Sequence, residues 1–402
     1  MTMRILSVFG TRPEAIKMSP IVRLLKQTDG VEVRVCVTAQ HRQMLDQALE
    51  LFNIKPDYDL DLMREGQSLA QLSAGIFTHL DPVLEEFKPD WILAVGDTTT
   101  VLNTSLLAFY RKIKFGHVEA GLRTHNKWHP FPEEINRRIA TVTADAHFAP
   151  TELSKQNLLH EGVEPENIFI TGNSVIDALK FVAGQEEPKE ITELLERLEI
   201  RGLEIRELEP KRLETRGVET RRLETRGVET RRLETRRLIL VTAHRRENFG
   251  EPMENICKAL RELALRDDVE IVYPVHLNPN VQEPVNRILK DVKRITLLPP
   301  LDYLPLAHLM KHAKLILTDS GGIQEEAPTF GIPVLVMRET TERPEGVDAG
   351  VLKLTGTDTA RIVEEATRLL DDPSAYAQMA RAVNPYGDGH AAERIVDALL
   401  KA

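Results

Sequence analysis

Acidic side chains follow the strands that the sequence predicts for the first half of the chain. Asp97 comes directly after one apolar run, and Glu119 comes directly after the next. Glu133 and Glu134 are expected in the aromatic, proline-rich loop that contains Trp128 to Pro132. A single carboxylate in such a place is often only a helix cap, but several around one cleft are typical of general acid and base catalysis. These four residues are therefore candidates for proton transfer.

Basic side chains occur at comparable points in both halves of the chain. Arg12 and Lys17 flank the turn that follows the first predicted strand. His244, with two arginines after it, follows the first strand of the second half, and Arg343 lies in a later loop. Each of them alone could be a solvated surface group. Converging on one cleft, they would suit a substrate that carries phosphates.

The stretch Ser320-Gly321-Gly322 links a buried strand to a predicted short helix. Adjacent glycines let the backbone approach a ligand closely, and the first N–H groups of a helix favour a phosphate. Glu325 and Glu326 are expected in the first turn of that helix, where one of them could accept hydrogen bonds from a ribose. The alternative is a strand-to-helix turn that binds nothing. The position at a strand's carboxyl end favours the ligand site.

Alternating strands and helices must position these residues. The strands expected in the first half are 5–9, 31–38, 91–95, 115–118, 145–149 and 168–170. Those expected in the second half are 238–242, 270–274, 295–297, 315–318 and 334–337. Strands that alternate with helices indicate parallel sheets, whose carboxyl ends face the ligand. The sequence thus predicts an α/β protein with two doubly wound, Rossmann-like domains that face a cleft.

The composition excludes several classes of protein. A length of 402 residues allows two or more domains, and 42% hydrophobic with 28% charged residues is typical of soluble globular chains. The net charge of −10 argues against nucleic acid as a partner. Two cysteines fit neither a disulfide framework nor a zinc site, no metal cluster is visible, and no stretch is long enough to span a bilayer. We expect a cytoplasmic protein.

A repeat separates the two predicted domains. Residues 212–221 recur without change as 222–231, and 232–236 begin a third copy. Apolar residues recur every five positions from Leu213 to Leu233, a spacing that forms neither a helical stripe nor one face of a strand. Residues 201–237 hold 12 Lys or Arg and 8 Asp or Glu. We interpret this segment as a low-complexity insertion without a catalytic part, the alternative being a basic docking tail.

Long motifs in a fixed order identify a family resemblance. They include Phe-Gly-Thr-Arg-Pro-Glu-Ala-Ile-Lys at 9–17, His-Val-Glu-Ala-Gly-Leu-Arg at 117–123 and Thr-Asp-Ser-Gly-Gly-Ile-Gln-Glu-Glu at 318–326. Further matching stretches are 38–42, 96–99, 132–134, 244–247, 274–279, 341–345 and 384–389. Together they resemble the non-hydrolysing UDP-N-acetylglucosamine 2-epimerases over nearly the whole chain outside the insertion.

The resemblance implies a GT-B-like architecture and an activity. The expected domains are 1–172, joined by a C-terminal helix at 385–402, and a UDP-binding domain at 173–384 that carries the insertion 201–237. The family interconverts UDP-GlcNAc and UDP-ManNAc as a homodimer, without a bound cofactor or metal. It also uses a second UDP-GlcNAc as an activator.

Site residues follow from the motifs position by position. The resemblance implies that the catalytic group is Asp97, Glu119, Glu133 and His244. It implies that substrate is bound by Arg12, Lys17, Asp97, Glu119, His244, Leu301, Leu306, Ser320, Gly321, Gly322, Glu326 and Arg343. It places the activating molecule near Gln40, Gln43 and Gln67. The chain departs from the family at Val95, where many members have His, at Leu306, where a Phe is common, and at Gly66, where some have Arg.

The chemistry of C2 epimerisation explains this combination of residues. The hydrogen on C2 of the sugar is not next to a carbonyl, so cleavage of the C1–O bond must first, or at the same moment, acidify it. UDP would leave to give 2-acetamidoglucal and return after C2 is reprotonated on the other face. Cations would stabilise the departing diphosphate, and two faces require two proton-transfer groups.

Two other functions fit the same fold. A GT-B glycosyltransferase would use a UDP-sugar but require an acceptor, and a sugar-nucleotide sensor would bind without turnover. The complete acidic set argues against the sensor. Incubation with UDP-GlcNAc alone distinguishes all three.

Overall fold

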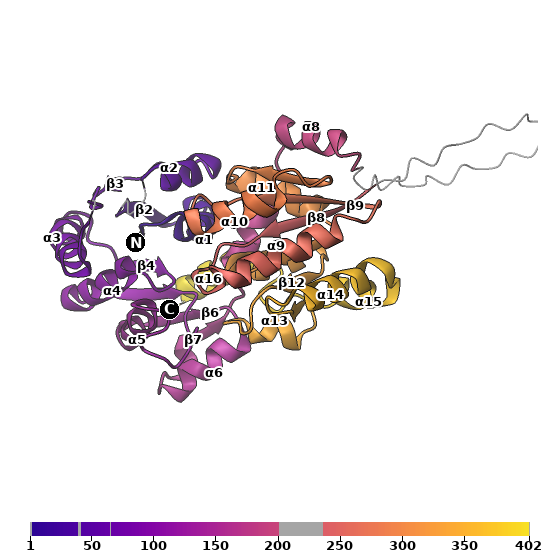
Figure 1. Ribbon diagram of the computed structural model, residues 1–402. Coiled ribbons are helices and arrows are strands. Elements are labelled where there is room, and N and C mark those ends of the chain that lie inside the picture. The colour runs from indigo at the N-terminus through magenta and orange to yellow at the C-terminus, as the bar shows by residue number, and fades with distance from the viewer. Residues whose placement is uncertain (1, 39–41, 65, 201–235, 402) are drawn as a thin grey trace, which may run out of the picture.

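The computed structural model describes residues 2–38, 42–64, 66–200 and 236–401, and the chain forms two parallel sheets side by side (Figure 1). In the described part of the chain, the first sheet has the order β3-β2-β1-β4-β5-β6-β7. Its strands are β1 (Met3–Phe9), β2 (Val31–Val37), β3 (Tyr58–Asp59), β4 (Trp91–Val95), β5 (Lys114–Val118), β6 (Ala146–Ala149) and β7 (Ile168–Ile170).

The second sheet has the order β10-β9-β8-β11-β12-β13 within the described residues. Its strands are β8 (Arg237–Thr242), β9 (Val269–Pro274), β10 (Ile295–Leu298), β11 (Leu315–Thr318), β12 (Val334–Val336) and β13 (Leu352–Leu354). Every strand that the sequence predicts is present to within two residues at either end. The edge strands β3 and β13 were not predicted, because their sequences, Tyr-Asp and Leu-Lys-Leu, contain no continuous apolar run.

Helices cover both faces of the first sheet. One face carries α3 (Leu69–Phe87), α4 (Thr99–Arg111) and α5 (Glu133–Thr143), which share an apolar core with the sheet. The other face carries α1 (Arg12–Lys26), α2 (Arg42–Leu51), α7 (Ser174–Ala183) and α16 (Ala391–Lys401). The helix α6 (Glu152–His160) contacts β6 and β7. Two covered faces explain why the strands are continuous apolar runs.

The second sheet is covered in the same way. One face packs on α9 (Glu251–Leu263), α10 (Pro279–Leu289), α14 (Thr359–Asp371) and α15 (Pro373–Ala380). The other face meets α11 (Tyr303–His312) and α12 (Gly321–Glu326), while α13 (Pro344–Asp348) contacts β13. The helix α8 (Lys189–Arg197) packs on α11. Each of the two sheets is therefore doubly wound, as the alternation of strands and helices predicts.

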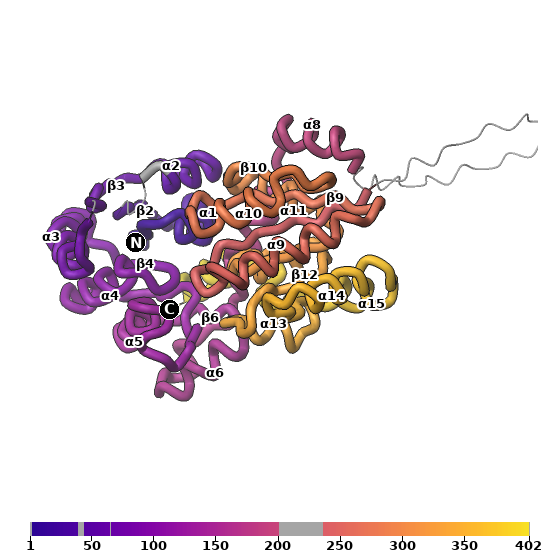
Figure 2. Tube along the Cα trace, viewed as in Figure 1, coloured from indigo at the N-terminus to yellow at the C-terminus, as the bar shows by residue number. Residues whose placement is uncertain are grey.

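Two elements join the halves. The helix α7 contacts α1 and α16 on one side and α11 and α12 on the other. The C-terminal helix α16 returns to the first half, as the tube in Figure 2 shows, and packs on α1. Where these connections meet, the backbone N–H of Asn173 donates to the carbonyl of Tyr386 at 2.7 Å. One apolar core cluster consequently includes residues of both sheets.

Two further expectations concern the insertion between the domains and membrane-spanning segments. Of the predicted insertion 201–237, residues 201–235 lie outside the described residues, and its last residue, Arg237, already begins β8. Among the described residues, no helix is both long and apolar enough to cross a membrane.

Candidate active site

The strand order reverses between β1 and β4 in the first sheet and between β8 and β11 in the second. Ligands of doubly wound sheets bind at such switch points. A cavity of about 480 Å³ lies between the two halves at these points. Its lining includes ten of the predicted substrate residues, namely Arg12, Lys17, His244, Leu301, Leu306, Ser320, Gly321, Gly322, Glu326 and Arg343.

Glu14 holds the first turn of α1 in place. It forms a capping box with Thr11, and its carboxylate also accepts from the backbone N–H of Gly10 at 2.9 Å and from Thr98 Oγ1 at 2.6 Å. Thr98 belongs to the turn after β4, so one buried carboxylate ties together the turns that carry Arg12 and Asp97. Arg12 and Lys17 both line the cavity.

Glu119 lies at the end of β5 in a left-handed backbone conformation, with φ of 63°. Its Oε1 accepts from Lys17 Nζ at 2.5 Å and from Asn173 Nδ2 at 2.8 Å. Burial by itself would raise the pKa of Glu119, but Lys17, Arg343 and Asn173 outweigh it and hold the pKa below its usual value. Glu119 is thus held in its ionised form, as a general base must be.

Asp97 follows Gly96, whose φ of 83° requires a residue without a side chain. His117 Nε2 lies 2.7 Å from the carbonyl of Gly96, and Asn136 Nδ2 donates to the carbonyl of Asp97 at 2.8 Å. The carboxylate of Asp97 accepts from Arg137. A side chain at Gly96 would lie 3.5 Å from Glu119 Oε2, so Asp97 and Glu119 stand on adjacent turns.

Glu133 begins α5 and is half-buried, rather than lying in the loop before it. Residues at positions i, i+3 and i+4 share one helix face, so Glu133 lies on the face whose Asn136 and Arg137 contact Asp97. The next carboxylate, Glu134, accepts from two backbone N–H groups of the preceding loop. The structure therefore brings Asp97, Glu119 and the start of α5 together on the first-half side of the cleft, where Glu119 contacts the lining residue Lys17. Asp97, Glu119 and Glu133 are not themselves among the residues that line the cavity.

His244 lines the cavity from the second half. Asp319 is fully buried and accepts from the backbone N–H groups of His244 and Arg245, at 2.9 and 2.8 Å. The His244 ring stacks on His276 with centroids 5.4 Å apart. Burial lowers the pKa of His244, although Asp319 opposes the shift. A neutral imidazole in the cleft can accept a proton.

The glycine turn of the second half lies under two guanidinium groups. A side chain at Gly321 would meet Arg343 Nη1 at 2.8 Å and Arg245 Nη2 at 3.2 Å. Our placement of Glu325 and Glu326 was wrong, because α12 starts at Gly321 and both residues lie in its last turn. There Glu325 accepts from Arg343 Nε at 2.6 Å. The cavity thus presents cations and exposed backbone where a diphosphate could lie.

Glu326 differs from the acids of the first half. Burial, followed by the charge of Glu325, raises the pKa of Glu326 to about 8. Its Oε2 has no hydrogen-bond partner among the described residues. Leu301 and Leu306 line the same cavity and give it an apolar side.

Three contributors to this site were not predicted, namely Asn136, Arg137 and Asn173. The spacing of Asn136 and Arg137 after Glu133 gave a usable helical signal. Asn173 gave none beyond its place at a predicted domain boundary.

The predicted activator residues are only partly described. Gln40 and the side chain of Gln43 lie outside the described residues. Gln67 is half-buried in the turn before α3, and its Oε1 has no hydrogen-bond partner in the described part of the chain.

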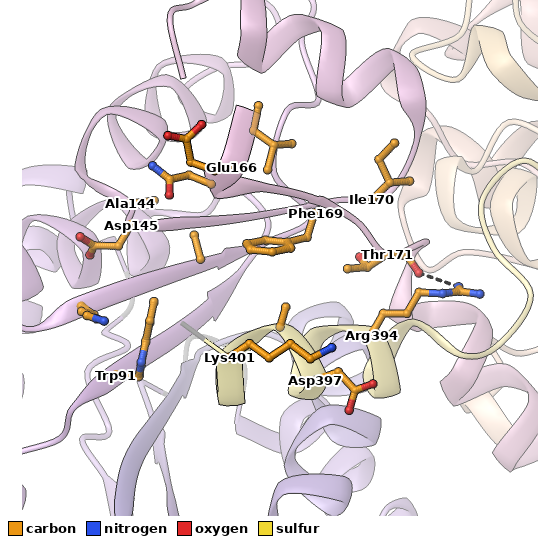
Figure 3. Close-up of a pocket in the computed structure, with 15 residues that line it drawn as sticks. Trp91, Ala144, Asp145, Glu166, Phe169, Ile170, Thr171, Arg394, Asp397 and Lys401 are labelled. Carbon is orange, nitrogen blue, oxygen red and sulfur yellow. Dashed lines mark hydrogen bonds between the residues drawn. The ribbon is translucent and has the colours of Figure 1, made fainter. Parts of the chain in front are cut away.

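A second, larger cavity of about 930 Å³ lies at the opposite end of the first sheet (Figure 3). It is lined by the beginnings of β4 to β6, by β7 and by α16, with Trp91, Asp145, Arg394 and Lys401 at its border. None of the predicted site residues lines it. The amino ends of parallel strands are not where doubly wound sheets bind ligands.

The fold and the cleft define the class of the protein. Two doubly wound domains that present acids from one side and phosphate-binding groups from the other are the arrangement of GT-B-like proteins that use nucleotide-sugars. The family model for UDP-N-acetylglucosamine 2-epimerase matches residues 23–400. The chain belongs to the UDP-N-acetylglucosamine 2-epimerase family.

Individual relatives agree with this assignment. The chain is 55% identical to the UDP-N-acetylglucosamine 2-epimerase of Yersinia pestis over 398 residues, covering 99% of this chain and 98% of that protein. The Escherichia coli enzyme of the same name is 54% identical with the same coverage. The crystal structure of UDP-GlcNAc 2-epimerase from Neisseria meningitidis bound to UDP-GlcNAc superimposes with a TM-score of 0.83 at 46% identity, covering both chains fully.

Proposed function

We propose that the protein interconverts UDP-GlcNAc and UDP-ManNAc by epimerisation at C2. The observation that carries this proposal is the pairing of the two switch points across one cavity. Arg12 and Lys17, the latter bound to Glu119, line this cavity from the first half, and a glycine turn under guanidinium groups lines it from the second. A nucleotide-sugar bound between them would have its diphosphate at the second sheet and its sugar at the first.

The first step is loss of UDP from the sugar. The diphosphate gains charge as the C1–O bond breaks, and Arg343, Arg245 and Arg12 are available to stabilise it. Positive charge that develops on C1 acidifies the C2 hydrogen, so a carboxylate can remove it. The products of this half-reaction are UDP and 2-acetamidoglucal, both retained in the cleft.

The second step returns a proton to the opposite face of C2 and UDP to C1. Two faces require two proton-transfer groups, and Asp97, Glu119, Glu133 and His244 are our candidates. Glu119 has the best support as a base, because the charges around it keep it ionised and its Oε1 is fixed by Lys17. Asp97 stands on the adjacent turn with its backbone fixed by Asn136.

Exchange of the C2 hydrogen tests the mechanism directly. Product recovered from heavy water should carry deuterium at C2, because the returning proton comes from a side chain that equilibrates with solvent. The measurement is mass spectrometry or proton NMR of UDP-ManNAc made from UDP-GlcNAc. Product without deuterium would favour oxidation and re-reduction by a nicotinamide and would exclude elimination.

A glycosyltransferase remains the alternative on the same fold. Incubation with UDP-GlcNAc alone separates the two, since an epimerase forms UDP-ManNAc without an acceptor. We expect UDP-ManNAc to accumulate to a constant ratio from either direction. Turnover only with added acceptor sugars would support the transferase.

We also propose a homodimer and a second, activating UDP-GlcNAc. An exposed aromatic surface supports the dimer: Phe109 and Tyr110 at the end of α4 are 63% and 64% exposed, and Tyr110 stacks on Phe77 of α3. Light scattering with Tyr110→Ser tests this surface. Sigmoidal dependence of the rate on UDP-GlcNAc, flattened by Gln67→Ala, tests the activator.

A further inference from the structure

Asn173 occupies the junction between the two halves and is buried. It is the N-cap residue of α7, and its Oδ1 accepts from the backbone N–H of Val175 at 3.1 Å. Because the oxygen is used there, the amide nitrogen must point the other way. It lies 2.8 Å from Glu119 Oε1 and 2.8 Å from Glu325 Oε2. One amide group thus donates to two carboxylates, Glu119 of the first half and Glu325 of the second.

Each of these carboxylates also has its own cation. Lys17 lies 2.5 Å from Glu119, and Arg343 Nε lies 2.6 Å from Glu325. The four charged side chains are at most 17% exposed. Two carboxylates that share one nitrogen in such a place would repel each other strongly without a donor between them. The amide of Asn173 therefore does more than begin a helix.

We propose that Asn173 is a positioning residue that holds Glu119 in the orientation and charge state needed for proton transfer at C2. This inference rests on the proposed function. Both bonds, from Lys17 and from Asn173, fall on Oε1 of Glu119. No hydrogen bond to Oε2 is found among the described residues, and Oε2 faces the Gly96 turn that carries Asp97. Oε2 is consequently the oxygen left available for proton transfer.

The competing explanation is that Asn173 only caps α7. Serine and aspartate are also good N-cap residues, so this explanation can be separated by substitution. Asn173→Ser keeps a capping oxygen and removes both amide donors. Asn173→Asp keeps the cap and places a third carboxylate between Glu119 and Glu325. A capping role predicts little change in either variant.

Steady-state kinetics with UDP-GlcNAc measure the effect. Loss of a hydrogen bond to a buried charge should lower kcat about tenfold or more in Asn173→Ser, with KM changed less than about threefold. Asn173→Asp should lower kcat further. As a control, Asp358→Ser exchanges the capping side chain of α14, on the outer face of the second sheet, and should leave kcat unchanged.

The pH dependence of kcat/KM is a second measurement, which a purely capping role of Asn173 would leave unchanged. Glu119 faces Lys17 from α1 and Arg343 from the loop before α13. Glu325 of α12 and His117 of β5 lie nearby. Removing the amide takes away one group that favours the ionised form. The acid limb of kcat/KM should therefore shift to higher pH in Asn173→Ser, and further in Asn173→Asp.

The outcomes are distinct. A wild-type protein that makes no UDP-ManNAc would refute the proposed function itself. Wild-type turnover together with unchanged kcat and pH profile in Asn173→Ser would refute only the role of Asn173. If Asn173→Ser fails to fold, Asn173→Asp decides, with UDP affinity by calorimetry as the check that the cleft is intact. An Asn173→Asp variant that binds UDP and turns over like wild type would overturn the inference.

Discussion

The two walls of the cleft are built on opposite principles. On the wall of the first sheet, each predicted acid with a described partner is held by a cation, Glu119 by Lys17 and Asp97 by Arg137. On the wall of the second sheet, the central feature is the absence of a side chain at Gly321, which leaves room beneath Arg343 and Arg245. Proton transfer requires fixed side chains, whereas holding a diphosphate requires open backbone and charge.

This contrast predicts that substitutions on the first wall affect turnover and that those on the second wall affect affinity. The largest effect should come from neutralising the acids. Asp97→Asn and Glu119→Gln should each lower turnover by roughly 10² or more, the usual size for a general acid or base. Affinity for UDP, measured by calorimetry, should not fall in either variant.

The exposed carboxylate of Glu190 on α8 provides the matched control, and Glu190→Gln should leave turnover unchanged. If turnover and UDP affinity fell together in Asp97→Asn, the separation of proton transfer on the first side from UDP binding on the second would be contradicted.

On the second wall, Gly321→Val should weaken binding of UDP itself. Its side chain would enter the space under Arg343, so UDP affinity should fall by at least about 1.4 kcal/mol, a factor of ten. Gly75→Val on α3 is the control, because the nearest atom there is Leu62 Cδ2 at 3.8 Å. Unchanged affinity in a folded Gly321→Val protein would show that the nucleotide lies elsewhere.

Glu326 sharpens the comparison, because the pKa of this acid is raised and not lowered. A carboxyl whose pKa is about 8 in the folded state and near 4.5 in the unfolded state contributes stability below pH 4.5 that is lost as the pH rises through 8. Glu326→Gln lacks that loss. The melting temperature of the variant relative to wild type should therefore increase between pH 5 and pH 9. A difference that stays constant with pH would contradict the raised pKa.

The smallest effect is expected outside both walls. Deleting residues 212–231 removes two identical decamers and joins residue 211 to the partial third copy at 232–236, so the sequence across the junction is unchanged. Loop-closure entropy changes by only about 0.6 kcal/mol per doubling of length, so activity and melting temperature should stay nearly unchanged. A tenfold loss of activity would make the repeat a functional part of the protein.

Most of the candidate site can be predicted from the sequence alone, because its residues follow the ends of strands. The strands of the first sheet are buried on both faces, so their ends are visible as the ends of apolar runs, and Asp97 and Glu119 follow directly. The short strands β3 and β13 lack such runs. The position of Glu325 and Glu326 was missed because α12 begins on the glycines themselves. Asn173 was missed because its function depends on two carboxylates 54 and 152 positions away.

The meeting of Asn173 with Tyr386 has a mechanical consequence. The chain passes between the halves twice, and the two passages are joined by one backbone hydrogen bond, with Gly172 and Gly387 in close approach. Two connections fastened at one place behave as a pivot: they resist sliding of one half past the other but leave rotation about that place. Because Asn173 lies on the pivot itself, its two bonds to Glu119 and Glu325 move least when the halves rotate.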